Sequence, residues 1–214
     1  MRSALSAICA ALLLGAVSPS DPPSGIVRVR IDTTRGPILL ALDAKRAPIT
    51  TANFLAYVDD GRYDGTVFYR AARSKARPGL GFVQAGVRTD LRRALPPIAL
   101  EPTSRTGIRH LDATVSMARG PFEGSATGNF VLTVGPSPQM NARPGFAGYA
   151  AFGRVAGGMD TVRRILAEPS GGGTGVMRGQ MILRPVRILR AVRLDGVAKP
   201  TGRPQVWRIL EGRG

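Results

Sequence analysis

The stretch YDGTVFYRAARSKARPGLGFVQAG, residues 63–86, contains two short apolar runs joined by a loop rich in arginine, proline and glycine. Each run has the length and the aromatic and β-branched content of a β-strand. Each run also carries one polar side chain that is hard to bury, Arg70 in the first and Gln84 in the second. The pattern predicts two strands, each with one polar side chain whose presence needs an explanation.

The rest of the chain is also rich in strand-like runs. Apolar and polar residues alternate in 26–34, and with the apolar run 38–43 that follows a turn they predict a hairpin. Helical spacing, with Pro48 in a first turn, predicts two short helices, within 47–64 and 157–169. Further strands are predicted at 113–118, 129–134 and 149–155, and one or two strands, interrupted by Pro185, at 181–194. About eight strands without βαβ alternation predict a mainly-β fold, a closed eight-stranded antiparallel barrel capped by two short helices.

The N-terminus has the features of a targeting segment. Arg2 precedes an apolar run that is too short for a comfortable membrane span of about 20 residues, and small residues follow at 16–18. We therefore predict a signal peptide at 1–18 and export to the periplasm or the medium; an uncleaved anchor is the alternative. The predicted organisation continues with a linker at 19–25, one domain at 26–196 and a polar tail at 197–214, with Trp207 as a candidate surface anchor.

The composition argues against several classes of function. The formal net charge is +16, but it comes from scattered arginines, with no basic run and no interleaved aromatic residues. We interpret the charge as a bias of the source genome and predict no nucleic-acid partner. The single cysteine, Cys9, lies inside the predicted signal peptide. A processed chain would then have no disulfide, thiol nucleophile or cysteine metal site.

Residues for acid–base or covalent chemistry are scarce. A serine hydrolase would have to pair the lone histidine, His110, with Ser116 or Ser125, and neither serine lies in a Gly-x-Ser-x-Gly turn. We expect His110 to be a surface residue. The GGGTG segment at 171–175 lacks the pattern of a phosphate or dinucleotide loop and is expected to be a mobile loop. We predict no metal and no cofactor.

Rotation about an X–Pro bond needs none of those groups. The barrier of about 18–20 kcal/mol comes from amide resonance, and no covalent bond breaks. An apolar pocket for the proline and one fixed donor for the twisted amide would suffice. A guanidinium on a rigid strand is such a donor.

The segment APITTANFLAYVDDGRYDGTVFYR, residues 47–70, resembles the N-terminal half of the cyclophilins, the barrel-shaped peptidyl-prolyl cis–trans isomerases. Further blocks resemble the family in the same order: VSMAR (115–119), GNFVLTVG (128–135), AAFGRVAGGMDTVRRI (150–165) and VRILRAVRL (186–194). The similarity extends over residues 26–194. Several ordered blocks make it specific, where one alone would be weak. With the targeting segment, it indicates a bacterial, exported member.

The resemblance implies the roles of the site residues. Arg70 stands at the family's catalytic arginine, and Gln84 at the glutamine that supports that arginine and the substrate backbone. Strand alternation predicts that Phe68 shares a face with Arg70, Phe82 with Gln84, and that Asn129 and Val131 lie together. The substrate-binding residues implied in this way are Phe68, Phe82, Gln84, Met117, Ala118, Arg119, Asn129, Val131 and Tyr149.

The chain departs from the family pattern around the pocket. The departures are Tyr69 for histidine, Arg119 for asparagine, Asn129 for glutamine, Val131 for phenylalanine and Tyr149 for the late histidine. If Gln84 keeps its role, Gly81 stands where the family has its pocket phenylalanine, and Phe82 stands at the family's methionine position. A shifted register would place Phe82 at the phenylalanine position but would misplace the glutamine. The smaller pocket predicts modest activity.

The function predicted is a monomeric peptidyl-prolyl isomerase that acts on proline-containing segments of exported proteins. Two alternatives remain open at this stage. One is a cyclophilin-like proline-peptide binding or chaperone domain with weak or no catalysis. The other is a basic binder of anionic envelope components.

Overall fold

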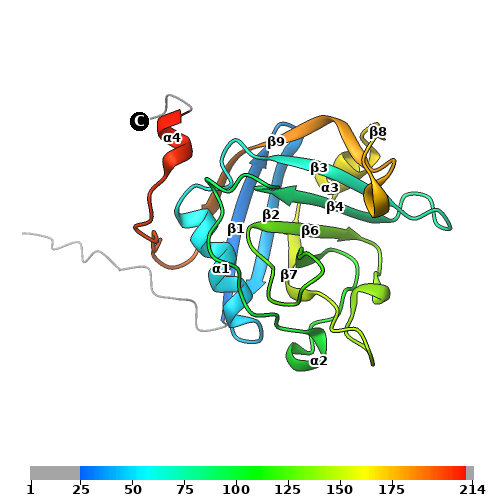
Figure 1. The fold of residues 1–214 in the computed structure, drawn as a ribbon, viewed down its shortest axis with the longest axis horizontal. Helices are drawn as coiled ribbons and strands as arrows, with labels where there is room; N and C mark the ends of the chain where they lie inside the picture. The colour runs from blue at the N-terminus through cyan, green and yellow to red at the C-terminus, as the bar shows by residue number, and fades with distance from the viewer. Residues whose placement is uncertain (1–24, 211–214) are drawn as a thin grey trace, which may run out of the picture.

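The structure is a computed structural model, and it describes residues 25–210. Eight antiparallel strands form a closed barrel, in which the first strand, β1, pairs with both β2 and β9 (Figure 1). Around the barrel the order is β1-β2-β7-β5-β6-β4-β3-β9. The strands are β1 Ile26–Thr33, β2 Gly36–Asp43, β3 Val67–Arg73, β4 Gly81–Gly86, β5 Thr114–Met117, β6 Asn129–Val134, β7 Ala150–Gly157 and β9 Met181–Arg193. The predicted fold class is confirmed.

The structure adds two details to the predicted strands. The glycine-rich segment after residue 169 is not a plain loop, because it contains a two-residue strand, β8 (Ser170–Gly171), and a 3-10 turn, η2 (Gly175–Met177). β8 pairs with β9 outside the closed ring. β9 is a single strand that continues through Pro185. Pro185 lies where the pairing of β9 with β3 is irregular, so the ladder does not need the N–H that proline lacks.

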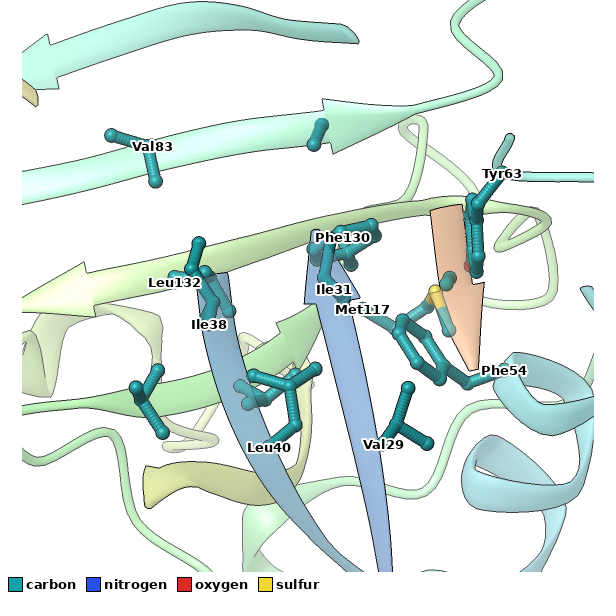
Figure 2. Packing of buried hydrophobic residues seen from close by; sticks show 14 of the residues in the cluster. Val29, Ile31, Ile38, Leu40, Phe54, Tyr63, Val83, Met117, Phe130 and Leu132 are labelled. Carbon is teal, nitrogen blue, oxygen red and sulfur yellow. The ribbon is translucent and has the colours of Figure 1, made fainter. Parts of the chain in front are cut away.

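Alternate side chains of the strands fill the barrel (Figure 2). On β1 and β2 the buried members include Val29, Ile31 and Leu40. An aromatic group lies at one end of this core, where Phe54 contacts Tyr63 and Phe130 at ring-centroid distances of 5.0 and 5.2 Å. Tight packing of this kind gives the strands fixed positions, which a site built on their outer faces requires.

Helix α1 (Pro48–Asp59) packs against β9, β2 and β7, and α3 (Met159–Ala167) against β3, β2, β4 and β6. Both predicted helices are present. The first turn of α1 is capped from a distance, because the Glu101 carboxylate accepts hydrogen bonds from the backbone N–H groups of Ile49 and Thr50. That carboxylate also accepts a bond from the Thr50 hydroxyl at 2.7 Å. Glu101 therefore supplies the negative charge that a helix N-terminus favours.

Three further helical turns were not predicted: α2 (Thr103–Thr106), the 3-10 turn η1 (Pro138–Met140) and α4 (Val206–Leu210). The chain after β9 returns to the end of α1, where Thr201 donates to the Asp60 carboxylate from both its N–H and its hydroxyl (Figure 1). Trp207 is only 2% exposed. The tail is thus anchored to the domain at Thr201 and Trp207, while most of its other described residues are exposed. Within residues 25–210 no helix is both long and apolar enough to cross a membrane.

Candidate active site

A β-bulge in β3 decides which side chains reach the outer face of the barrel. Phe68 pairs with Ala85 and Arg70 with Gln84, so Tyr69 is an extra residue in the ladder. The bulge reverses the alternation, and Phe68 and Arg70 no longer share a face. Phe68 is 0% exposed and meets Phe130 in the core. The prediction that Phe68 contacts substrate is corrected accordingly: it is a core residue.

The Arg70 guanidinium is held from two sides. Its Nη1 donates to Oε1 of Gln84 at 3.0 Å, and its Nε donates to Oε1 of Gln180 at 2.8 Å. Its Nη2 makes only a long contact, 3.5 Å, with the carbonyl oxygen of Val176. The Phe82 ring lies 5.0 Å from the guanidinium carbon. Burial lowers the pKa of Arg70 from its ordinary value, but an arginine keeps its charge in proteins.

A hollow of about 410 Å³ opens beside Arg70. Of the residues predicted for the site, eight line it: Arg70, Phe82, Gln84, Met117, Ala118, Arg119, Val131 and Tyr149. Phe82 and Gln84 face the same hollow, as expected when Gln84 keeps its place. Met117 borders the hollow from beneath, because it is 1% exposed and packs in the core (Figure 2).

Sequence reasoning missed five residues that line the hollow. They are Gln139, Met140, Phe146, Val176 and Met177. All five lie in loops or 3-10 turns, where no periodicity marks a side chain as facing a site. Phe146 supplies aromatic surface that the prediction of a small, weakly apolar pocket had not included. With Phe82 and Tyr149, three aromatic side chains now surround a space that could take a pyrrolidine ring.

Asn129 lies at a neighbouring hollow of about 350 Å³. The two hollows share the lining residues Gln84, Ala118, Arg119 and Met177, so they adjoin as a two-part groove. Asn129 holds the backbone of Arg88, accepting from its N–H at 2.7 Å and donating to its carbonyl at 2.9 Å. Its role is thus to shape the second hollow.

Arg119 joins the loops on either side of the groove. Its Nε donates to the Gly148 carbonyl at 3.0 Å, and its Nη1 donates to the carbonyls of Gly120 and Pro121. The guanidinium carbon also lies 5.1 Å from the Tyr149 ring. The arginine that replaces the expected asparagine therefore braces the wall of the site.

Tyr69, the extra residue of the bulge, lines the second hollow and contacts Asn129 through its hydroxyl at 3.3 Å. Burial raises the pKa of Tyr69 to about 12, against the opposing effects of Arg88, Arg70 and Gln84. A histidine at this position would titrate near neutral pH, whereas this tyrosine stays neutral there.

The sequence led us to expect His110 at the surface, and this prediction is wrong. Its side chain is buried, and the residue is only 1% exposed. Its Nε2 lies 2.8 Å from the Ser116 hydroxyl and its Nδ1 lies 2.8 Å from Oδ1 of Asn141. Burial lowers the pKa of His110, which favours the neutral ring. Ser116 is 0% exposed, so this serine–histidine–asparagine chain has no substrate access and ties β5 to the loop at 141. Among residues 25–210 no group of three or more His, Cys, Asp and Glu gathers to hold a metal.

Comparison with known proteins agrees with this geometry. A family model described as "Cyclophilin type peptidyl-prolyl cis-trans isomerase/CLD" matches residues 27–193. The chain belongs to the cyclophilin family. It is 31% identical to peptidyl-prolyl cis-trans isomerase A of Dickeya dadantii, over 87% of this chain and 97% of that protein. It is 35% identical to isomerase cyp18 of Streptomyces antibioticus, over 69% of this chain and 87% of the relative.

The cyclophilin fold is equally clear in solved structures. The crystal structure of a Cryptosporidium parvum cyclophilin-type peptidyl-prolyl cis-trans isomerase aligns with a TM-score of 0.63 and 21% identity, over 80% of this chain and 99% of that one. This chain is therefore a cyclophilin-type peptidyl-prolyl cis–trans isomerase, an enzyme. The alternative of a binding domain without catalysis rested on a pocket that had lost aromatic surface, and Phe146 supplies such surface here.

Proposed function

We propose that Arg70 is the catalytic donor of this cyclophilin, and that its substrates are proline-containing segments of exported proteins. The observation that carries the proposal is a charged guanidinium held by two side-chain amides at the edge of an apolar hollow. The test is the isomerisation rate of an X–Pro peptide with the wild-type protein and with Arg70→Ala.

The chemistry follows from amide resonance. In the planar ground state the lone pair of the prolyl nitrogen is delocalised into the carbonyl, and twisting the bond localises it on nitrogen. An N–H donor placed near that nitrogen is therefore bound more strongly by the twisted state than by either planar isomer. Nη2 of Arg70 is the guanidinium nitrogen with the weakest protein contact, 3.5 Å to Val176, and so is the one free to act.

The hollow would supply orientation. The proline ring is apolar and can rest against Phe82, Val131 and Met140, which line the space next to Arg70. Ground-state binding by these contacts is modest, since the site is open to solvent on one side. Catalysis then depends on the fixed position of the donor, which costs no reorganisation during the twist.

We predict that Gln84→Leu lowers kcat/KM about 10- to 50-fold, because the variant removes a hydrogen bond to a charged group and frees one side of the Arg70 fork. Leucine has a similar volume, so the barrel should keep its thermal stability. The measurement is a protease-free isomerisation assay on an X–Pro peptide. Gln205→Leu, in the C-terminal tail, is the matched control. An unchanged kcat/KM in Gln84→Leu would contradict a supporting role.

Export is the second part of the proposal, and it is supported by the sequence of residues 1–25. We expect the protein produced in a bacterial host to appear in the periplasm or medium as a monomer that begins at Pro19. Intact mass and N-terminal sequencing of the fractionated cells would show this. Leu13→Arg, which interrupts the apolar run, should leave the chain unprocessed in the cytoplasm. Wild-type protein that keeps Met1 in the cytoplasm would refute the prediction.

A further inference from the structure

The Nε group of Arg70 has a partner outside the two strands that the sequence singled out. It donates at 2.8 Å to Oε1 of Gln180, which stands directly before β9. We propose that Gln180 is a positioning residue of the isomerase site, which sets the plane of the Arg70 guanidinium from the side opposite Gln84. The proposal rests on the catalytic role proposed for Arg70.

Two acceptors fix the guanidinium better than one. A planar fork held only at Nη1 can still pivot about that single hydrogen bond, because the arginine side chain has several rotatable bonds. A second fixed acceptor at Nε, on another corner of the same plane, removes that freedom. The remaining nitrogen, Nη2, is then directed to one place beside the hollow.

Gln180 is itself held in position. Its Nε2 donates to the Val176 carbonyl oxygen at 3.1 Å, and the same oxygen receives the long contact from Nη2 of Arg70. The three residues therefore form a closed set of contacts, in which the amide of Gln180 cannot turn over without losing both of its bonds. The orientation does not require bound substrate.

Gln180 belongs to the segment between α3 and β9, which is anchored where it leaves α3. Arg73, three residues after Arg70, donates to the Leu166 carbonyl at 2.7 Å and to the Ser170 hydroxyl at 3.1 Å. Ser170 in turn donates to the Gly179 carbonyl at 3.0 Å. β3 thus carries both Arg70, the proposed donor, and Arg73, which anchors the segment that positions Arg70.

Backbone geometry at the tip of this segment requires glycine. Gly173 has a φ of +75°, and a Cβ there would lie 2.5 Å from the Met177 carbonyl oxygen. The turn therefore brings Val176 and Met177 to the wall of the hollow, where the Val176 carbonyl oxygen accepts from Gln180. The glycine-rich stretch that gave no motif in the sequence builds a support for the site.

The test compares Gln180→Met with the wild-type protein, since methionine keeps the length but has no strong acceptor. We expect kcat/KM to fall about 5- to 20-fold, mainly through kcat, with KM within twofold. The Arg70 Nε–H signal in a ¹⁵N NMR spectrum, assigned by its loss in Arg70→Ala, should shift and exchange faster with water. Arg178→Ala, in the same turn, is the control and should leave both readouts unchanged.

The outcomes separate the two proposals. If Arg70→Ala abolishes catalysis but Gln180→Met leaves kcat and the Nε–H signal unchanged, the inference about Gln180 is wrong and the role of Arg70 stands. If Gln180→Met and Arg178→Ala lower activity equally, or the loss follows a lower Tm, the segment is only structural and the inference is also wrong. If Arg70→Ala itself retains full activity, the proposed function fails first.

Discussion

Replacing Arg70 by alanine is expected to lower kcat/KM for an X–Pro peptide about 100- to 1000-fold, the usual loss when one preorganised donor is removed from a site. The fold should persist, because Arg70 lies on the outer side of β3 and the core packs without it. Exchange NMR of the peptide measures the rate directly, and thermal unfolding checks the fold.

Two further variants sharpen this result. Arg70→Lys keeps the charge but cannot donate to Gln84 and Gln180 from two corners of one plane, so we expect it to recover little activity. Arg77→Ala, in the exposed loop between β3 and β4, removes an arginine of the same hairpin and should leave the rate unchanged. Full activity in Arg70→Ala, or an equal loss in Arg77→Ala, would exclude this site.

Periodicity explains why the barrel could be predicted. The bounds expected from the sequence for the strands at 26–34, 38–43 and 129–134 differ from the observed ones by two residues at most. In β1 alternate residues are buried, and a one-residue slip would turn its apolar side chains outward. β6 is buried almost throughout, and a nearly unbroken apolar run marks it in the sequence. Positions buried in the barrel must be apolar, so the pattern of apolar residues in the sequence predicts the strands.

The site follows different rules, and this is where sequence reasoning failed. Alternation places Phe68 beside Arg70, but one extra residue in the ladder reverses the relation. Nothing in the letters VFYR marks a bulge, because it depends on how β3 pairs with β4 and β9. The contacts of Gln180 and Phe146 likewise depend on loop conformation, and only the folded chain brings them to Arg70. The family resemblance predicted that Gln84 supports Arg70, and the two side chains are in contact; the partners that loops supply could not be predicted.

The same limitation applies where the C-terminal tail meets the end of α1, at an unexpected buried ion pair. Nε of Arg62 lies 2.7 Å from Oδ2 of Asp60, and the side chains of Asp60 and Arg62 are 1% and 2% exposed. Asp60 also accepts two hydrogen bonds from Thr201, and the Trp207 ring lies 4.7 Å from the Arg62 guanidinium carbon. One guanidinium nitrogen of Arg62, Nη2, is buried without a hydrogen-bond partner. Asp60 thus balances a buried charge and holds the tail at once.

Asp60→Ala is therefore expected to destabilise the protein by about 3–5 kcal/mol, since it leaves Arg62 buried and unpaired. The surface pair Asp160–Arg163 offers a control, because Asp160 is 84% exposed and Asp160→Ala should cost at most about 0.5 kcal/mol. Chemical unfolding at neutral pH measures both values. A loss in Asp60→Ala no larger than in Asp160→Ala would show that the pair contributes nothing beyond a surface contact.

The effect of Asp60→Ala should also depend on pH. Burial raises the pKa of a carboxyl group, but at Asp60 the hydrogen bonds from Thr201 and Arg62 outweigh burial and hold its pKa below the ordinary value. A group with a lowered folded-state pKa contributes stability above its unfolded pKa and loses it as the pH falls through the folded value. The stability gap between wild type and Asp60→Ala should therefore be constant near neutral pH and narrow in acid. A gap that widens as the pH falls would mean that the folded-state pKa of Asp60 is raised, not lowered, and would contradict the prediction.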